Sequence, residues 1–371
     1  MIYHPNVRPL FYAAKKQAMS DLDFLAAFGH EPIAARAAHG RVNLIGEHTD
    51  YCSGYVMPTL ISQRLTVQIS LRDDDIIHGI SSEFGEERAQ LDQIATNSWL
   101  LFIKGAIALL NEKGAGLSGL NILTTSSIPA GAGVSSSAAF EIALLRALSD
   151  ITKIDLKPKE MALMGQRIEH EFIGTKCGIM DQMAVAMAEL GQALFLDCQS
   201  LDTQIVALPE GVCLAVIHSG SSRKLSSSLY NERLSETIRA AQEMGRASLR
   251  EAQFDDLEKL SDETLIKRSR HVLSENERVH RAKTALLAGD ILSLGLSMVE
   301  SHISLRDDYE VSSDELDALV GAMISQGAYG ARLTGAGFGG CIVALLDEDS
   351  AAEIIAAVLA ECEGAWLVDC L

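Results

Sequence analysis

The chain has 371 residues, 48% hydrophobic and 22% charged, which is typical of a globular protein and long enough for two domains. With 31 Lys and Arg against 50 Asp and Glu, the net charge is −19, which disfavours binding to nucleic acid or to an anionic membrane surface. No stretch reaches the ~18 consecutive apolar residues of a membrane helix and the start lacks an apolar signal segment, so we expect a cytoplasmic protein that binds neither nucleic acid nor membrane.

The seven cysteines are scattered along the chain without the Cys-x-x-Cys spacing of a zinc site. We therefore expect most of them to be reduced core residues and predict no disulfide framework. A change in composition near residues 197–211, ending in a Pro-Glu-Gly turn, predicts a domain boundary there. The expected domains are residues 1–208 and 209–371.

The first motif spans residues 40–58, where an alternating apolar strand leads through Gly46 into a group of polar residues. Glu47, His48 and Asp50 follow within four positions. Two carboxylates and an imidazole at this spacing can hydrogen-bond several neighbouring hydroxyl groups, as a sugar presents them. The alternative is a solvated turn in which the aspartate caps a helix.

Residues 65–71 alternate as a strand, an acidic turn follows, and residues 76–80 are predicted to return as the hairpin partner of that strand. Apolar residues at helical spacing then predict a helix over residues 99–110, with Trp99 at its start.

The second motif, residues 128–139, lies between a predicted strand (residues 120–124) and a predicted helix that begins at Ala138. Gly131 and Gly133 allow close approach of the backbone to a ligand, and the N-terminal end of the helix attracts an anion. Three consecutive serines, residues 135–137, add hydroxyl groups that can reach phosphate or Mg²⁺. No lysine follows the glycines, so this is not a P-loop. A serine-capped helix after a glycine turn is the alternative.

A helix is predicted over residues 158–172, with Glu169 beside its buried stripe, and Asp181 lies near the start of the next helix. Farther on, a serine-rich stretch contains the cations Arg223 and Lys224. Residues 274–277 form a capping-box pattern and predict a helix over residues 279–287.

The third motif is the glycine-rich stretch of residues 333–340. It contains the G-x-G-x-x-G pattern, but an apolar strand follows where a dinucleotide site needs a helix. The pattern therefore favours a glycine-lined hairpin that passes close to a ligand or another loop.

The three motifs in this order resemble those of the GHMP kinases, and residues 40–58 resemble the signature of the galactokinases within them. The resemblance extends over about residues 36–346. It implies a two-domain α+β fold, with an N-terminal domain like ribosomal protein S5 domain 2, a C-terminal ferredoxin-like domain and the active site between them. It also implies ATP, Mg²⁺ and transfer of the γ-phosphoryl group to the anomeric hydroxyl of α-D-galactose, the first step of galactose catabolism by the Leloir pathway.

By resemblance, Asp181 is the general base or orienting carboxylate and Arg41 is its cationic partner. The remaining expected roles follow the family motifs. The sugar is expected to contact Glu47, His48, Asp50, Gly178, Asp181 and Tyr230; ATP is expected to contact Trp99, Gly131, Ala132, Gly133, Val134, Ser135, Ser136 and Ser137; Mg²⁺ is expected at Ser137 and Glu169; and the third motif is expected to contribute Gly335, Gly337 and Gly339. The expected partners are small molecules and the expected state is a monomer.

The sequence departs from the usual family pattern at His39, at Cys52 and Ser53, and over residues 218–223. Two alternatives therefore stay open at this point. One is an anomeric kinase for a related sugar, such as N-acetylgalactosamine, L-arabinose or galacturonate, because a few changes in a hydrogen-bonding pocket can switch specificity. The other is a galactose- and ATP-binding sensor without catalysis, which the intact stretch of residues 134–139 disfavours.

Overall fold

The computed structural model describes residues 23–221 and 226–371, and the cations Arg223 and Lys224 lie outside these ranges. The described chain divides into two compact units. The first contains the described residues up to Gly40, Gln63–Ala130 and Ser135–Met187, and the second contains Arg41–Ser62, Gly131–Val134 and Ala188–Leu371. The chain therefore passes between the units several times. A domain boundary between residues 208 and 209 stays a prediction.

The sheet of the first unit is built on β3 (Pro58–Leu71), whose last part pairs antiparallel with β6 (Leu120–Ser126). β6 pairs in parallel with β4 (Ile76–Ser81), and β4 pairs antiparallel with β5 (Gly85–Gln90). β1 (Ala34–Asn43) pairs with β3. The predicted hairpin between residues 65–71 and 76–80 is therefore wrong, because β6 lies between these two strands.

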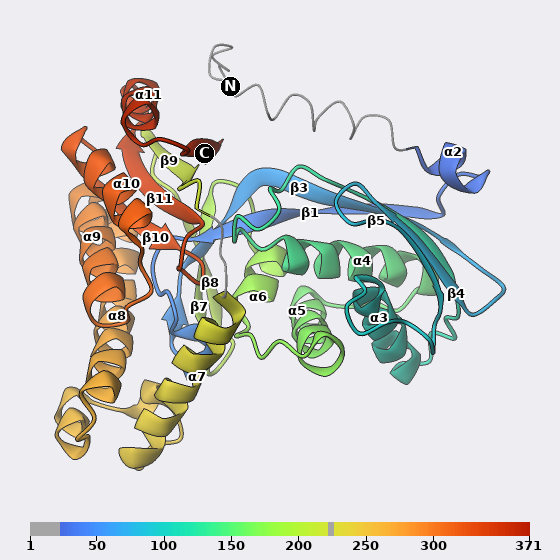
Figure 1. Ribbon diagram of the computed structural model, residues 1–371, viewed down its shortest axis with the longest axis horizontal. Helices are drawn as coiled ribbons and strands as arrows, with labels where there is room; N and C mark the ends of the chain where they lie inside the picture. The colour runs from blue at the N-terminus through green and yellow to red at the C-terminus, as the bar shows by residue number, and fades with distance from the viewer. Residues whose placement is uncertain (1–22, 222–225) are drawn as a thin grey trace. The chain divides into compact units, whose positions relative to one another are not determined.

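Helices of the first unit cover one face of this sheet, as Figure 1 shows. They are α3 (Leu100–Glu112), α4 (Ser136–Thr152), α5 (Pro158–Ile168) and α6 (Met180–Met187), and a short α2 (Phe24–Phe28) precedes β1. α4 packs deeply into this unit, with Leu144 and Leu145 fully inaccessible. The predicted helix over residues 158–172 is α-helical only to Ile168 and continues as the π-helical turn η2 (Glu169–Ile173).

The second unit contains a four-stranded antiparallel sheet in the order β10-β11-β9-β12 (Figure 1). Its strands are β9 (Val212–His218), β10 (Gly330–Thr334), β11 (Cys341–Asp347) and β12 (Trp366–Cys370), and its helices are α7 (Ser226–Glu243), α8 (Glu263–Ala288), α9 (Ile291–Asp307), α10 (Asp314–Ser325) and α11 (Ala351–Glu361). β10 and β11 form the predicted glycine-lined hairpin.

Shorter elements complete the second unit. The strands β2 (Tyr55–Val56), β7 (Gln192–Asp197) and β8 (Thr203–Ala207) pair antiparallel in the order β2-β7-β8, and the 3₁₀ turns are η1 (Asp50–Cys52), η3 (Leu249–Glu251) and η4 (Phe254–Lys259). The capping-box pattern at residues 274–277 does not begin a helix, because α8 runs through it. The Ser274 hydroxyl instead donates to the Arg270 carbonyl at 2.7 Å.

Cys213 and Cys370 form a disulfide that links β9 to β12. This bond was not predicted from the sequence, which indicated no disulfide framework and led us to expect that most cysteines are reduced. The other five cysteines, all within the described ranges, form no disulfide, and Cys52 and Cys341 are buried.

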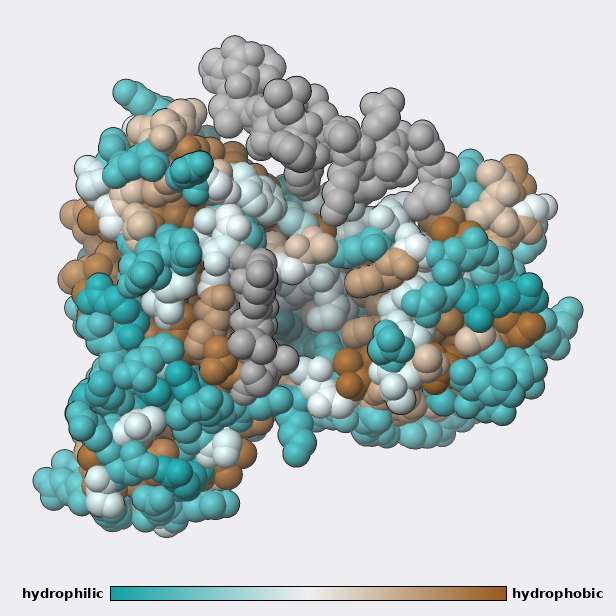
Figure 2. Space-filling view, in the orientation of Figure 1, coloured by the Kyte–Doolittle hydropathy of each residue, from teal (hydrophilic) through white to brown (hydrophobic). Residues whose placement is uncertain are grey.

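The visible face of the molecule in Figure 2 is largely hydrophilic. Among the described residues, no helix combines the length and the apolar composition that crossing a membrane requires. The cytoplasmic location and the monomeric state expected from the sequence stay predictions.

Candidate active site

The second motif connects β6 to α4 by a loop whose backbone depends on left-handed residues. Gly131, Gly133 and Ser135 have φ angles of 70°, 76° and 61°. α4 begins directly afterwards at Ser136, so the N–H groups of its first turn are available to an anion. The order strand, glycine loop and helix is thus confirmed, with the helix starting two residues earlier than predicted.

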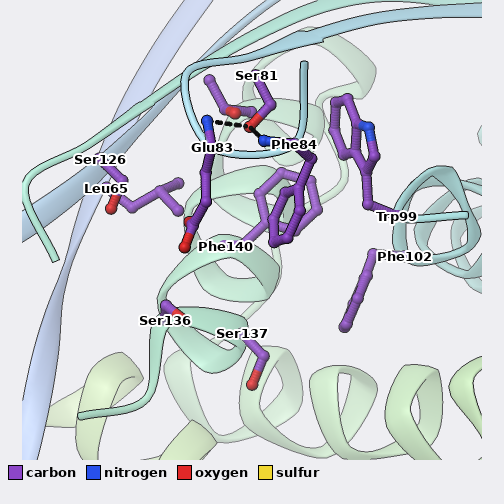
Figure 3. A pocket seen from close by; sticks show the side chains of 11 residues that line it. Leu65, Ser81, Glu83, Phe84, Trp99, Phe102, Ser126, Ser136, Ser137 and Phe140 are labelled. Carbon is purple, nitrogen blue, oxygen red and sulfur yellow. Dashed lines mark hydrogen bonds between the residues drawn. The ribbon is translucent and has the colours of Figure 1, made fainter. Parts of the chain in front are cut away.

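A pocket of the first unit opens beside the start of α4 and is drawn in Figure 3. Its empty volume, counted with the space open to solvent, is about 530 Å³. Four aromatic side chains contribute to its walls, and Ser136 and Ser137 lie at one side. The pocket is lined by Leu65, Ser81, Glu83, Phe84, Trp99, Phe102, Thr124, Ser126, Ser136, Ser137 and Phe140.

Trp99 and Phe84 form the flat part of this pocket. Their ring centroids are 6.3 Å apart and their planes differ by 24°. Phe84 is 62% exposed and is placed by the β4–β5 turn, where the Ser81 hydroxyl accepts the Phe84 N–H at 3.2 Å (Figure 3). Trp99 was predicted from the sequence but Phe84 was not, because a single aromatic residue in a short turn carries no motif.

Two acidic groups of the first unit lie next to the serines of the second motif. The Ser135 hydroxyl donates a hydrogen bond to Asp181, near the start of α6. Glu169 begins the π-helical turn, is only 6% exposed and is hydrogen-bonded to Ser137. Burial raises the pKa of Glu169, and hydrogen bonds to Glu141, Ser137 and Thr175 oppose that rise.

Glu141 was not identified from the sequence, although it is fully buried on α4. Burial, and then the charge of Glu169, raises the pKa of Glu141 well above its usual range. Both causes favour the protonated form of Glu141. Its Oε2 accepts from Gln182 Nε2 at 3.1 Å, so this buried carboxyl contacts the residue that follows Asp181.

In the second unit, the first motif forms a tight turn at Gly46, which has a φ of 95°. A Cβ there would lie 2.5 Å from the Tyr55 carbonyl oxygen, so only glycine fits. Glu47 follows and is 2% exposed. Its Oε2 accepts from Arg332 Nη2 at 2.9 Å.

His48 lies at the centre of a hydrogen-bonded chain of side chains. Burial lowers the pKa of His48 to about 3, so the ring is neutral. Its Nε2–H donates to the Ala336 carbonyl at 3.2 Å, and Nδ1 accepts from the Tyr51 hydroxyl at 2.8 Å. Tyr309 continues the chain, with its hydroxyl 2.7 Å from that of Tyr51. His48 thus links the first motif to the third.

Asp50 and Tyr230 belong to the same unit as this turn. Asp50 begins η1, and Tyr230 lies near the start of α7 with its ring centroid 5.9 Å from that of His48. Arg41 is also in this unit, and its Nη1 donates to the Gly133 carbonyl at 2.9 Å.

The third motif joins β10 to β11 with several glycines at positive φ. Gly335, Gly337 and Gly339 have φ angles of 83°, 74° and 109°. A Cβ on Gly337 would lie 2.2 Å from the Val311 carbonyl oxygen, so this loop passes close to the segment after α9 as expected of a glycine-lined hairpin.

The structure therefore groups the predicted site residues in two sets. Trp99, Glu169, Asp181, the three serines and Gly178 belong to the first unit. The second unit contains Arg41, Glu47, His48, Asp50, Tyr230, Gly131 to Val134 and the third motif. Among the described residues, no group of three or more His, Cys, Asp or Glu is placed to hold a metal ion.

We expect the buried histidine His271 to make stability depend on pH. Burial lowers its pKa from 6.5 to about 4, so the unfolded chain binds the proton more readily. The contribution is complete above about pH 6.5 and is lost as the pH falls toward 4, by about 2–3 kcal/mol. Urea denaturation of wild type and His271→Gln at pH 7 and pH 4.5 tests this. Parallel losses of the free energy of unfolding in the two proteins would contradict it.

Comparison with known proteins agrees with this geometry. Residues 101–189 match the GHMP kinases N terminal domain, residues 282–364 match GHMP kinases C terminal, and residues 23–71 match the galactokinase galactose-binding signature. The fold is also similar to that of Methanococcus jannaschii mevalonate kinase, with a TM-score of 0.67 at 20% identity over 92% of this chain and 98% of the other. The fold and its glycine loops thus define a GHMP kinase.

Closer similarity is found to galactokinases. The galactokinase of Chloroflexus aggregans is 41% identical over 346 residues, covering 90% of this chain and 89% of the relative. The structure of Lactococcus lactis galactokinase complexed with galactose matches with a TM-score of 0.88 at 33% identity, covering 97% of each chain. The chain therefore belongs to the galactokinase family. It is a sugar kinase of the α+β class, and kinases of this family use ATP.

Proposed function

We propose that the chain transfers the γ-phosphoryl group of ATP to the anomeric hydroxyl of α-D-galactose, giving galactose 1-phosphate and ADP. The observation that carries this proposal is the galactose-binding signature over residues 23–71, which includes Glu47, His48 and Asp50. The Lactococcus lactis relative, crystallised with galactose, supports the same sugar.

In this proposal the sugar hydroxyls contact Glu47, His48, Asp50, Tyr230 and the backbone at Gly178. A carboxylate and a phenol can each bind neighbouring sugar hydroxyls, and together they distinguish galactose from its epimers. The proximity of the Tyr230 and His48 rings within the second unit supports a shared sugar pocket.

ATP is proposed to place its phosphates on residues 131–137 and its base in the pocket of Trp99. The left-handed glycines and the start of α4 supply N–H donors to the phosphates. Flat aromatic walls suit a purine, because base stacking on an aromatic side chain contributes about 1–3 kcal/mol.

Ser137 and Glu169 are proposed to hold Mg²⁺. Both ligand atoms are oxygens, which this ion prefers, and their hydrogen bond brings them together at the start of α4. Mg²⁺ usually keeps phosphate and water in its other positions, so two protein ligands suffice. When bound, the ion neutralises charge on the phosphates.

Asp181 and Arg41 complete the proposed mechanism. Asp181 orients the C1 hydroxyl and takes its proton as the oxygen forms a bond to the γ-phosphorus and the bond to the β-phosphate bridging oxygen breaks. The Ser135 hydroxyl, by donating to Asp181, holds that carboxylate in one orientation. Arg41 offsets negative charge on the transferred group.

The direct test is Mg²⁺-dependent ADP release from the purified protein with galactose, 2-deoxygalactose, N-acetylgalactosamine, L-arabinose, galacturonate, glucose and mevalonate. We expect galactose to be the best substrate, and NMR of the product to show phosphate on C1. Discrimination against analogues that lack a bound hydroxyl can reach about 10⁴-fold.

Other outcomes of this panel would contradict the proposal in distinct ways. A different preferred sugar would make the chain an anomeric kinase of altered specificity and direct attention to Cys52 and Ser53. Galactose binding in calorimetry without ADP release from any sugar would indicate a sensor.

A further inference from the structure

Buried charged residues surround Glu47 in the second unit and contact both its side chain and its main chain. We propose that Arg332 and Glu275 are positioning residues of the sugar site, which hold Glu47 in the one orientation that receives the sugar. This inference rests on the proposed role of Glu47 in sugar binding and goes beyond it. Neither residue belongs to the three motifs from which the active site was predicted.

Glu275 lies on α8 and is fully buried. Its Oε1 accepts the Gly46 N–H at 2.8 Å, the Glu47 N–H at 3.3 Å and the Ser301 hydroxyl at 2.7 Å. Two successive N–H groups of the turn are thus directed at one carboxylate oxygen. Since charge-assisted hydrogen bonds of this kind are the stronger ones, the backbone conformation at residues 46–47 depends on Glu275.

Arg332 lies on β10 and is also fully buried. Its Nη2 donates to Glu47 Oε2 at 2.9 Å, and its Nη1 donates to the Asn43 carbonyl at 2.9 Å. One guanidinium therefore joins the Glu47 carboxylate to the strand that leads into the turn. An unpaired buried charge is strongly destabilising. If the Glu47 carboxylate moved away from Arg332, both charges would be left buried and unpaired, so the ion pair holds the carboxylate in this position.

His271, one turn before Glu275 on α8, completes the arrangement. Its Nε2–H donates to the Glu47 carbonyl at 3.0 Å. The N–H, the carbonyl and the carboxylate of Glu47 are thus each bound by a different buried side chain. Holding the main chain and the carboxylate together in this way is what the positioning of a sugar-binding carboxylate requires.

The charges in this cluster balance. Glu275 also accepts from Arg278 Nε at 2.7 Å, so two carboxylates face two guanidinium groups. Burial raises the pKa of Glu275, but the charges of Arg278 and Arg332 lower it to about 2, and the carboxylate stays ionised throughout the working range of pH. Glu275 therefore accepts the hydrogen bonds of the Glu47 turn as a charged carboxylate throughout that range.

The test compares Arg332→Lys and Glu275→Gln with a matched control, Arg268→Lys. Arg268 is also buried and ion-paired in this unit, with Glu236 and Glu310, and it makes no hydrogen bond to the turn of Glu47. We expect Arg332→Lys to raise the KM for galactose about 10- to 100-fold and Glu275→Gln about tenfold, with the KM for ATP within about twofold of wild type. The control should change neither constant by more than about twofold.

A double-mutant cycle with Glu47→Gln separates this inference from the proposed function. If Arg332 acts through Glu47, adding Arg332→Lys to Glu47→Gln should raise the galactose KM by less than about threefold. The positioning role would be overturned if the effects of Arg332→Lys and Glu47→Gln on the galactose KM multiply in the double variant. It would also be overturned if Arg332→Lys and Glu275→Gln each show the same galactose KM as the control. If circular dichroism shows that Arg332→Lys does not fold, the galactose KM of Glu275→Gln is the deciding measurement. Unchanged galactose binding in Glu47→Gln would instead overturn the proposed sugar contact.

Discussion

Replacing Asp181 with asparagine is expected to lower kcat by about 10³-fold while ATP binding is retained. The carboxamide oxygen of the new side chain can still accept the hydrogen bond that Ser135 donates to Asp181, so the local geometry should survive. What is lost is the group that takes the proton of the sugar hydroxyl, and a general base typically contributes about 10²- to 10⁴-fold. The measurement is ADP release at saturating galactose together with ATP titration by calorimetry.

A matched control is Ser135→Ala, which removes the hydrogen bond to Asp181 but leaves its carboxylate. We expect a smaller loss in kcat, about tenfold, because a misoriented base still accepts a proton. Full activity in Asp181→Asn would remove Asp181 from the mechanism. Equal losses in the two variants would mean that orientation, and not proton transfer, is its contribution.

Local patterns in the sequence predicted the motifs well because each motif is contiguous. The strand, glycine loop and helix around Gly131 needed no distant partner for their identification, and neither did the hairpin that contains Gly335. Which strands pair with each other was harder to predict from the sequence. Residues 76–80 were assigned to the neighbouring strand in the chain, whereas β4 pairs in parallel with β6, which follows about 40 residues later.

The capping-box pattern at Ser274 shows how tertiary context overrides a local signal. Ser-x-x-Glu is a helix start only where the backbone before it is not helical. Here Val272 and Leu273 are buried, so α8 continues through the pattern and the Ser274 hydroxyl bonds back along the helix. The end of the predicted helix at residue 172 differs for a related reason, since the π-helical turn at Glu169 is stabilised by side-chain contacts that spacing does not reveal.

The supporting residues of the site were the least predictable. Glu275 lies 228 positions from the Glu47 N–H that it accepts, and Arg332 lies 285 positions from the carboxylate that it binds. Glu141 occupies a buried position on α4 where an apolar residue is usual. An acidic residue within the otherwise apolar run of residues 138–145 is a signal that could have identified it.

Replacing Arg41 with alanine is expected to lower kcat by about 10³-fold or more while ATP binding remains measurable. Cationic groups that stabilise the charge of a transferred phosphoryl group typically contribute about 10³- to 10⁵-fold. Arg41 is only 5% exposed, and its backbone N–H donates to the Val134 carbonyl at 3.0 Å. That main-chain bond persists in the variant, so the loop should keep its position. Single-turnover phosphoryl transfer is the measurement.

The side chain of Arg41 has two separable contributions, one through its charge and one through its hydrogen bond to the Gly133 carbonyl. Added guanidinium ion can restore the charge in Arg41→Ala but not the anchoring of the loop. Partial recovery of kcat by millimolar guanidinium, with an unchanged KM for ATP, is the outcome expected of a charge contribution. A raised KM for ATP without recovery would assign Arg41 to loop anchoring alone. Full activity without guanidinium would remove Arg41 from the mechanism.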